Sequence, residues 1–293
     1  MLSKSTSNNP FRYKDPFRMW QVYNMLSDGK IGRLLDFGCG NGYFLGKLKN
    51  KVEGLYGCDP YGEPFEKKSV NFEDVKFEKI NPHEPLPYPD CFFDVVTAIE
   101  VIEHVGDEKR VIRELYRILK NGGVLIITVP NKGIFDFLDR GNLKFNFPKL
   151  HKFLYSRFYG KENYLKHFVN EKNMYGDVTI TDNSYHKHYN LKNIKELLRD
   201  EFEIKQYCLY SFFAPFIIIF MQIINILFNE LFRSFATKYP SPSSSAHSSS
   251  RQAARYSRAN KNISFLRKIL HIDGKIFHCN YSYGLIVKAE KVL

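Results

Sequence analysis

The sequence predicts an α/β fold, a doubly wound sheet of parallel strands with helices on both faces. Short apolar runs recur along the 293 residues, and helical patterns lie between several of them. Alternation of this kind is typical of a parallel sheet, because each helix returns the chain to the end of the sheet where the next strand starts.

The elements are expected in a definite order. A helix at residues 17–26 has apolar side chains at helical spacing, and a second helix at 107–119 is expected to stop at the turn Asn121-Gly122-Gly123. Asn190 is expected to cap a further helix. The strands are expected at residues 34–37, 54–58, 75–80, 93–99, 124–129, 202–207 and 283–289.

Composition limits the possible partners and compartments. The formal net charge of +12 indicates an anionic partner, either nucleic acid or an acidic membrane surface. The five cysteines are scattered, without the close pairs of a zinc or redox site, which favours a reducing cytosol. Residues 1–9 are polar and lack the apolar core of a secretion signal, so a cytoplasmic protein is expected.

A glycine-rich turn follows the first strand, whose last residues include Asp36. The turn contains Gly38, Gly40 and Gly42. Because glycine has no side chain, a ligand can approach the backbone at the carboxyl end of the strand. A dinucleotide fingerprint would have its third glycine at the position of Tyr43, which argues against a nicotinamide or flavin site.

Polar residues also follow the next two strands. Asp59 ends the second strand, where its carboxylate can accept hydrogen bonds from both hydroxyls of a ribose. Asn81 follows the third strand, where its side chain can face an adenine amino group.

Together these motifs resemble the class I S-adenosylmethionine-dependent methyltransferases, and within them the quinone-biosynthesis O-methyltransferases and related small-molecule methyltransferases. The resemblance is close over residues 13–131 and looser over 185–207. It implies a Rossmann-like sheet of about seven strands, the last one antiparallel, and S-adenosyl-L-methionine as cofactor. Asn81 stands where the family usually has aspartate, which predicts altered affinity without loss of binding. The cofactor-binding residues that the resemblance implies are Asp36, Gly38, Gly40, Gly42, Asp59, Asn81 and Glu100.

Candidate catalytic residues follow the fourth strand. Methyl transfer to a hydroxyl needs the acceptor held in line with the methyl group and a base for its proton. On a helix, Glu100, Glu103 and His104 would share one face. We interpret this face as a base with its orienting carboxylate; the alternatives are a divalent-metal site and a helix start with acidic residues, and no metal ligand is assigned. His188, before the later helix, is a second candidate base.

An insertion between the last two expected strands gives information about the molecule that accepts the methyl group. An apolar run at residues 209–232 is followed by a Ser/Pro-rich stretch and a basic amphipathic stretch. Because the strands on both sides are expected in one sheet, the insertion should lie on, or dip into, the cytoplasmic face of a membrane. The alternative is a buried helix at a dimer interface or over the substrate pocket.

The expected organisation is a methyltransferase domain at residues 1–208, with a cofactor half at 13–131 and a substrate cap at 132–190. A membrane-associating insertion at 209–273 and the final strand within 274–293 follow. The expected function is O-methylation of a small hydrophobic or lipid-linked acceptor. The rivals are an RNA ribose 2'-O-methyltransferase and a non-catalytic cofactor-binding scaffold. Nucleic acid is the less favoured partner, since the motifs of base N-methylation and pyrimidine C5-methylation are missing from the sequence.

Overall fold

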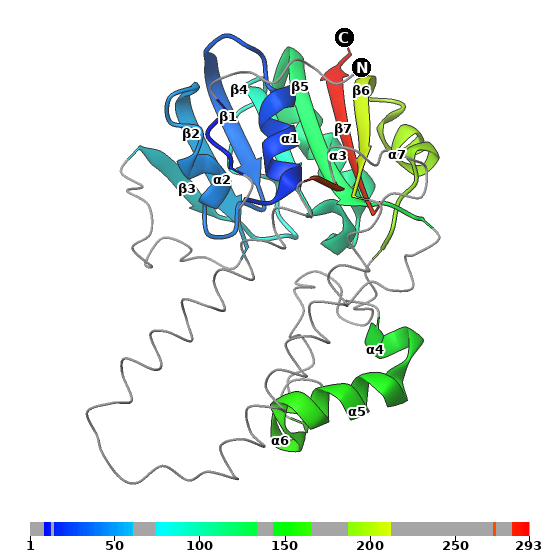
Figure 1. Cartoon of the computed structure of the whole chain (residues 1–293). Coiled ribbons are helices and arrows are strands. Elements are labelled where there is room, and N and C mark those ends of the chain that lie inside the picture. The colour runs from blue at the N-terminus through cyan, green and yellow to red at the C-terminus, as the bar shows by residue number, and fades with distance from the viewer. Residues whose placement is uncertain are drawn as a thin grey trace, which may run out of the picture.

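The computed structural model describes residues 9–12, 15–60, 74–133, 143–165, 187–211, 272–273 and 283–292. Its centre is a seven-stranded sheet of order β3-β2-β1-β4-β5-β7-β6 (Figure 1). Strands β1 to β5 are parallel, whereas β7 is antiparallel to both β5 and β6, which confirms the predicted fold. The strands are β1 (Ile31–Phe37), β2 (Val52–Asp59), β3 (Val75–Lys79), β4 (Phe93–Ile99), β5 (Leu119–Pro130), β6 (Phe202–Tyr210) and β7 (Gly284–Lys291).

Helices cover both faces of the sheet, and a separate apolar cluster fills the layer on each face. The helices α1 (Phe17–Met25) and α2 (Tyr43–Gly46) pack on one face, and α3 (Glu108–Ile118) and α7 (Leu191–Leu198) pack on the other (Figure 1). Successive strand residues point to opposite faces. Leu34 therefore belongs to the α1 cluster and Leu35 to the α3 cluster, and both are fully buried.

Both helices on the second face begin with side-chain caps. The Asp107 carboxylate accepts a hydrogen bond from the backbone N–H of Arg110 at 2.9 Å. The predicted cap at Asn190 is confirmed, because its side chain accepts from the Asn193 N–H at 2.8 Å while the Asn193 side chain accepts from the Asn190 N–H at 3.1 Å. Side chains thus satisfy N–H groups that a helix start leaves unpaired.

The predicted turn at residues 121–123 is an irregularity inside a strand. Helix α3 ends at Ile118, as expected, but β5 begins directly at Leu119, which pairs with Phe93. Pairing resumes between Val124 and Val95, so the extra residues lie between two paired positions of one strand. Gly122, with a φ of 71°, takes the left-handed conformation that this irregularity needs.

The described part of the expected substrate cap is a group of three helices, α4 (Leu143–Asn146), α5 (Pro148–Tyr159) and α6 (Lys161–Leu165). They contact one another and lie apart from the sheet in Figure 1. Of the expected insertion at 209–273, the structure describes only residues 209–211 and 272–273, and the strands on its two sides, β6 and β7, are neighbours as expected. Within the described ranges, no helix has the length and apolar character needed to cross a bilayer.

Candidate functional site

A cavity of about 400 Å³ lies at the carboxyl ends of the central parallel strands. This edge of a doubly wound sheet is where such folds bind their ligands. Residues that are far apart in the sequence therefore face one space. The predicted site residues that line it are Gly38, Asp59, Asn81, Glu100 and His104.

The glycine-rich loop packs against the end of a neighbouring strand. Gly38 has a φ of 72°, and a Cβ atom built there would lie 2.4 Å from Cγ2 of Val101, so no larger residue fits. The backbone N–H groups of Gly38 and Cys39 donate to the carbonyl oxygen of Cys58 at 2.8 and 3.1 Å. These bonds fix the bare backbone of the loop beside the end of β2.

Asp59 connects the end of β2 to the same loop. Its carboxylate Oδ2 accepts a hydrogen bond from the backbone N–H of Gly40 at 3.0 Å, and the residue is 8% exposed. A carboxylate offers about four acceptor positions. The bond to Gly40 therefore orients the group and leaves it able to accept from ribose hydroxyls.

Asn81 forms a small polar turn at the rim of the cavity. Its Oδ1 accepts from the backbone N–H of His83 at 3.1 Å, and its Nδ2 donates to Oε1 of Glu84 at 2.8 Å. An amide oxygen has two lone pairs. One acceptor position of Asn81 is thus used within the turn, and the expected contact with adenine depends on the other.

Asp36 lies behind the site and does not line the cavity. Its side chain is 3% exposed, and the hydroxyl of Thr97 donates to its Oδ1 at 2.7 Å. Burial raises the pKa of Asp36 to about 7, the bond from Thr97 opposes this rise, and the charge of Asp59 adds to it. Direct contact between Asp36 and a cofactor therefore stays a prediction.

The prediction that Glu100, Glu103 and His104 share one face of a helix is wrong for Glu100. Only Ile102–His104 form a helix, the short 3₁₀ turn η1, and Glu100 precedes it with a left-handed φ of 56°. Three hydrogen bonds to Thr128 of β5 hold Glu100 there. The Glu100 N–H donates to the carbonyl oxygen of Thr128 at 3.1 Å and to its hydroxyl oxygen at 3.0 Å, and the hydroxyl donates to Oε1 of Glu100 at 2.8 Å. The hydrogen bonds at the end of the pairing between β4 and β5 therefore set the conformation of Glu100.

Glu103 and His104 remain together as predicted. Oε1 of Glu103 lies 3.9 Å from Nε2 of His104, and the carboxylate is fully buried whereas 24% of the histidine side chain is exposed. The pair thus combines a ring that reaches the cavity with a carboxylate behind it. Within the described ranges, no three His, Cys, Asp or Glu residues are placed to hold a metal ion.

Arg18 of α1 is a site residue that the sequence reasoning missed. Arg18 is partly buried, and burial lowers the pKa of its guanidinium. The negative charges of Glu100 and Glu103 contribute to the opposite effect, and the pKa of Arg18 lies above its usual value. A cation from the N-terminal helix therefore lies near both carboxylates. The one signal in the sequence is that Arg18 is the only charged residue within 17–26.

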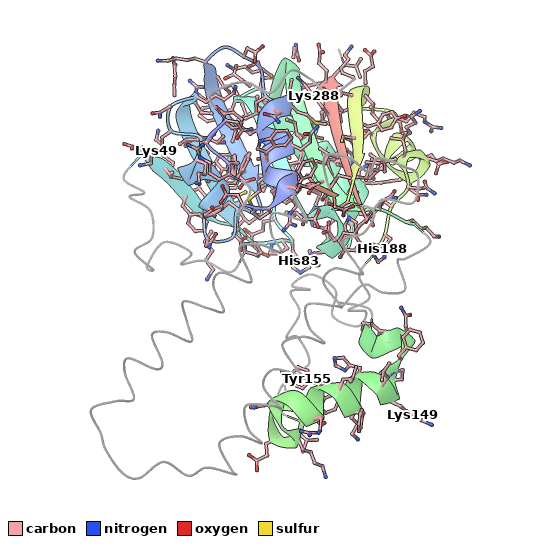
Figure 2. All side chains as sticks on the ribbon, in the orientation of Figure 1. Lys49, His83, Lys149, Tyr155, His188 and Lys288 are labelled. Carbon is pink, nitrogen blue, oxygen red and sulfur yellow. The ribbon has the colours of Figure 1, made fainter. Side chains whose placement is uncertain are left out.

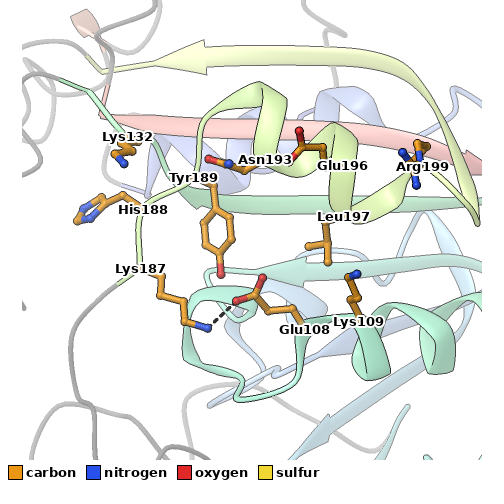
Figure 3. Close-up of a pocket in the computed structure, with 10 residues that line it drawn as sticks. All are labelled: Glu108, Lys109, Lys132, Lys187, His188, Tyr189, Asn193, Glu196, Leu197 and Arg199. Carbon is orange, nitrogen blue, oxygen red and sulfur yellow. Dashed lines mark hydrogen bonds and ion pairs between the residues drawn. The ribbon is translucent and has the colours of Figure 1, made fainter.

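The second candidate base, His188, lies elsewhere. It lines a separate open groove of about 690 Å³ between α3 and α7, and Figure 3 shows its ring pointing away from Tyr189. In the same view, Lys187 reaches Glu108 across the groove at 2.6 Å. The hydroxyl of Tyr189 donates to the carbonyl oxygen of Ile102 at 3.4 Å, so Tyr189 connects the groove wall to η1.

Known proteins match the part of the chain that builds this cavity. Residues 35–127 match the family described as methyltransferase domain. A probable S-adenosylmethionine-dependent methyltransferase of Mycolicibacterium smegmatis is 29% identical over 116 residues, which cover 38% of this chain and 43% of the relative.

Two further relatives show a similar extent of likeness. A probable S-adenosylmethionine-dependent methyltransferase of Mycobacterium tuberculosis is 32% identical over 118 residues, covering 40% of this chain and 43% of the relative. A ubiquinone biosynthesis O-methyltransferase of Colwellia psychrerythraea is 29% identical over 110 residues, covering 36% of this chain and 45% of the relative. The chain thus spans less than half the length of each of these relatives.

Proposed function

Since this chain contains a class I S-adenosylmethionine-dependent methyltransferase domain, we propose that the protein methylates an oxygen atom of a small hydrophobic or lipid-linked acceptor. One observation carries the proposal: His104 lines the same cavity as Gly38 and Asp59, and buried Glu103 lies behind it. A proton acceptor therefore shares one space with the residues that suit the cofactor.

The residues of the cavity fit S-adenosyl-L-methionine, which supplies an electrophilic methyl group on sulfur when it is bound. Gly38 offers bare backbone where a Cβ would collide with Val101, and Asp59 offers a fixed carboxylate for the ribose hydroxyls. Asn81 lies at the rim, where an adenine can meet its side chain.

His104 is the residue we assign to proton transfer. His104 would accept the proton of the acceptor hydroxyl while that oxygen takes up the methyl group that the bound cofactor would supply. Glu103, with its carboxylate oxygen 3.9 Å from the ring nitrogen, is placed to stabilise the positive charge that the ring gains.

Two observations support a hydrophobic acceptor. The apolar run at 209–232 begins in the last residues of β6, whose carboxyl end lies at the same edge of the sheet as the carboxyl ends of the cavity strands. One relative is named as an enzyme of ubiquinone biosynthesis. We propose, accordingly, that residues 209–273 associate peripherally with the cytoplasmic face of a membrane, which would bring the site close to such acceptors.

The test is incubation of the full chain with radiolabelled methyl donor and fractionated cell extract. Label in the lipid or small-molecule fraction supports the proposal, and label in RNA supports the ribose methyltransferase instead. Calorimetry with S-adenosyl-L-homocysteine runs in parallel as the control for folding and binding. If the protein binds S-adenosyl-L-homocysteine but no fraction takes up label, the result favours a non-catalytic scaffold that binds the cofactor.

A further inference from the structure

Helix α5 has two chemically different sides. Its inner side carries His151 and Tyr155, whose rings lie 5.9 and 6.0 Å from the ring of Tyr164 on α6. These contacts fix how α5 is rotated against its neighbour. The opposite side of α5 therefore faces away from α6.

The outward side exposes large apolar side chains. Phe153 is 65% exposed and Leu150 is 48% exposed, and Phe147, just ahead of the helix, is 43% exposed. Leu150 and Phe153 are three positions apart, so they lie beside each other on the helix surface. Contiguous exposed apolar patches mark surfaces that contact proteins or membranes.

The charged residues of α5 have one sign. Lys149, Lys152 and Arg157 are all exposed, and α5 contains no acidic residue. Lys149 and Arg157 are each four positions from Phe153, so basic groups border the apolar patch on the same side. Figure 2 shows Lys149 on the side of α5 turned away from the sheet, and Tyr155 on the side toward it.

We propose that this outward face of α5, comprising Lys149, Leu150, Phe153 and Arg157, binds the surface of an anionic lipid bilayer. Phenylalanine and leucine enter the boundary between headgroups and acyl chains, while lysine and arginine remain at the anionic headgroups. The charge selects an anionic surface over a neutral one. The inference rests on the proposed lipid-linked acceptor, and it adds a lipid contact in the cap, separate from residues 209–273.

The experiment measures flotation of the full chain with vesicles of phosphatidylcholine alone and with one-quarter phosphatidylglycerol. The double variant Leu150→Ser, Phe153→Ser is expected to lower partition into the anionic vesicles at least about tenfold. The matched control is Tyr207→Ser, because Tyr207 is 51% exposed on β6, away from this face. Its partition is expected to equal that of the unaltered protein.

A second pair of variants tests the charge. Each basic residue near an anionic surface contributes roughly fivefold to binding, so Lys149→Glu, Arg157→Glu should abolish most of the preference for anionic vesicles. Lys192→Glu, Lys195→Glu on α7 makes the same change of charge on another exposed helix and should have a smaller effect. S-Adenosyl-L-homocysteine binding should stay unchanged in all four variants, which shows that the sheet domain of each is folded.

Three results would overturn the inference. The first is unaltered flotation of Leu150→Ser, Phe153→Ser, which would assign lipid contact to another segment. The second is a change in molar mass by light scattering without a change in flotation, which would mean that a second copy of the chain covers this face. The third is failure of the unaltered protein to bind anionic vesicles, a result that leaves the radiolabel test of methyl transfer standing.

Discussion

The Asp59 carboxylate and the Gly40 backbone are joined by a hydrogen bond of 3.0 Å, which links the end of β2 to the glycine-rich loop. Asp59 therefore has two roles in the proposed site, fixing the loop and accepting from the ribose. Asp59→Ala removes both. Since a hydrogen bond to a charged group contributes about 1.5–3 kcal/mol, the Kd for S-adenosyl-L-homocysteine should rise roughly 10- to 100-fold in calorimetry.

Asp94 provides the matched control for Asp59→Ala. It lies near the start of β4, at the other end of the sheet, where it accepts from the Arg33 N–H at 2.7 Å and from Lys120 Nζ at 2.6 Å. Asp94→Asn should leave the Kd unchanged. If Asp59→Ala bound the product as tightly as the unaltered protein, the assignment of the ribose site to Asp59 would be refuted.

Asp36 should make stability depend on pH. Burial raises its pKa in the folded protein to about 7, against an ordinary value of 3.8, so between these values the folded state keeps a proton that the unfolded state releases. The free energy of unfolding should therefore fall as pH rises from about 4 to 7, by on the order of 4 kcal/mol at most, and then level off. Asp36→Asn should remove this dependence and be more stable than the unaltered protein above pH 7.

Urea unfolding of both proteins from pH 4 to 9 measures the Asp36 effect directly. The difference between the two curves isolates Asp36 from the other titrating groups. Thr97→Val should raise the pKa of Asp36 further, because it removes the hydroxyl that donates to the carboxylate at 2.7 Å. A constant difference across the whole pH range would contradict the buried, protonated carboxyl.

The residues that the sequence located well are those whose place follows from the strand pattern. Gly38 and Asp59 end neighbouring parallel strands, so the apolar runs before them were enough to bring them together. Glu100 was misplaced because helical spacing cannot reveal that Thr128, 28 residues later, fixes it in a left-handed conformation.

Tertiary packing also determines which residues reach the candidate site, and the sequence pattern does not predict this. Arg18 approaches Glu100 only because α1 packs across β5 and β7, contacts that no local pattern encodes. In the sequence, His104 was the first candidate base and His188, before the later helix, was the second. The structure separates them, because the chain before α7 runs along the groove between α3 and α7 and not along the cavity.

His104→Ala should slow methyl transfer by roughly 10²- to 10⁴-fold, the usual contribution of a positioned base. The Kd for S-adenosyl-L-homocysteine should change little, because Asp59 and the glycine loop remain. His188→Ala is the comparison, and it should retain most of the rate because its ring lines the other groove. Rates come from single-turnover assays with the acceptor fraction that takes up label. A larger loss in His188→Ala than in His104→Ala would reverse the assignment.

Lys291, near the end of the chain, should stabilise the fold through α3. Its Nζ donates to the carbonyl oxygens of Tyr116 and Leu119, both at 2.8 Å, and lies 4.2 Å from the centre of the Tyr116 ring. Lys291→Met keeps the apolar length but leaves the carbonyls of Tyr116 and Leu119 without this donor, so unfolding in urea should show a loss of about 2–4 kcal/mol. Lys288→Met is the milder control, because among the described residues Lys288 donates to one carbonyl, that of Met25, at 2.8 Å. Equal losses in both variants would mean that burial of the stem, and not the ammonium bonds, accounts for the contribution of Lys291.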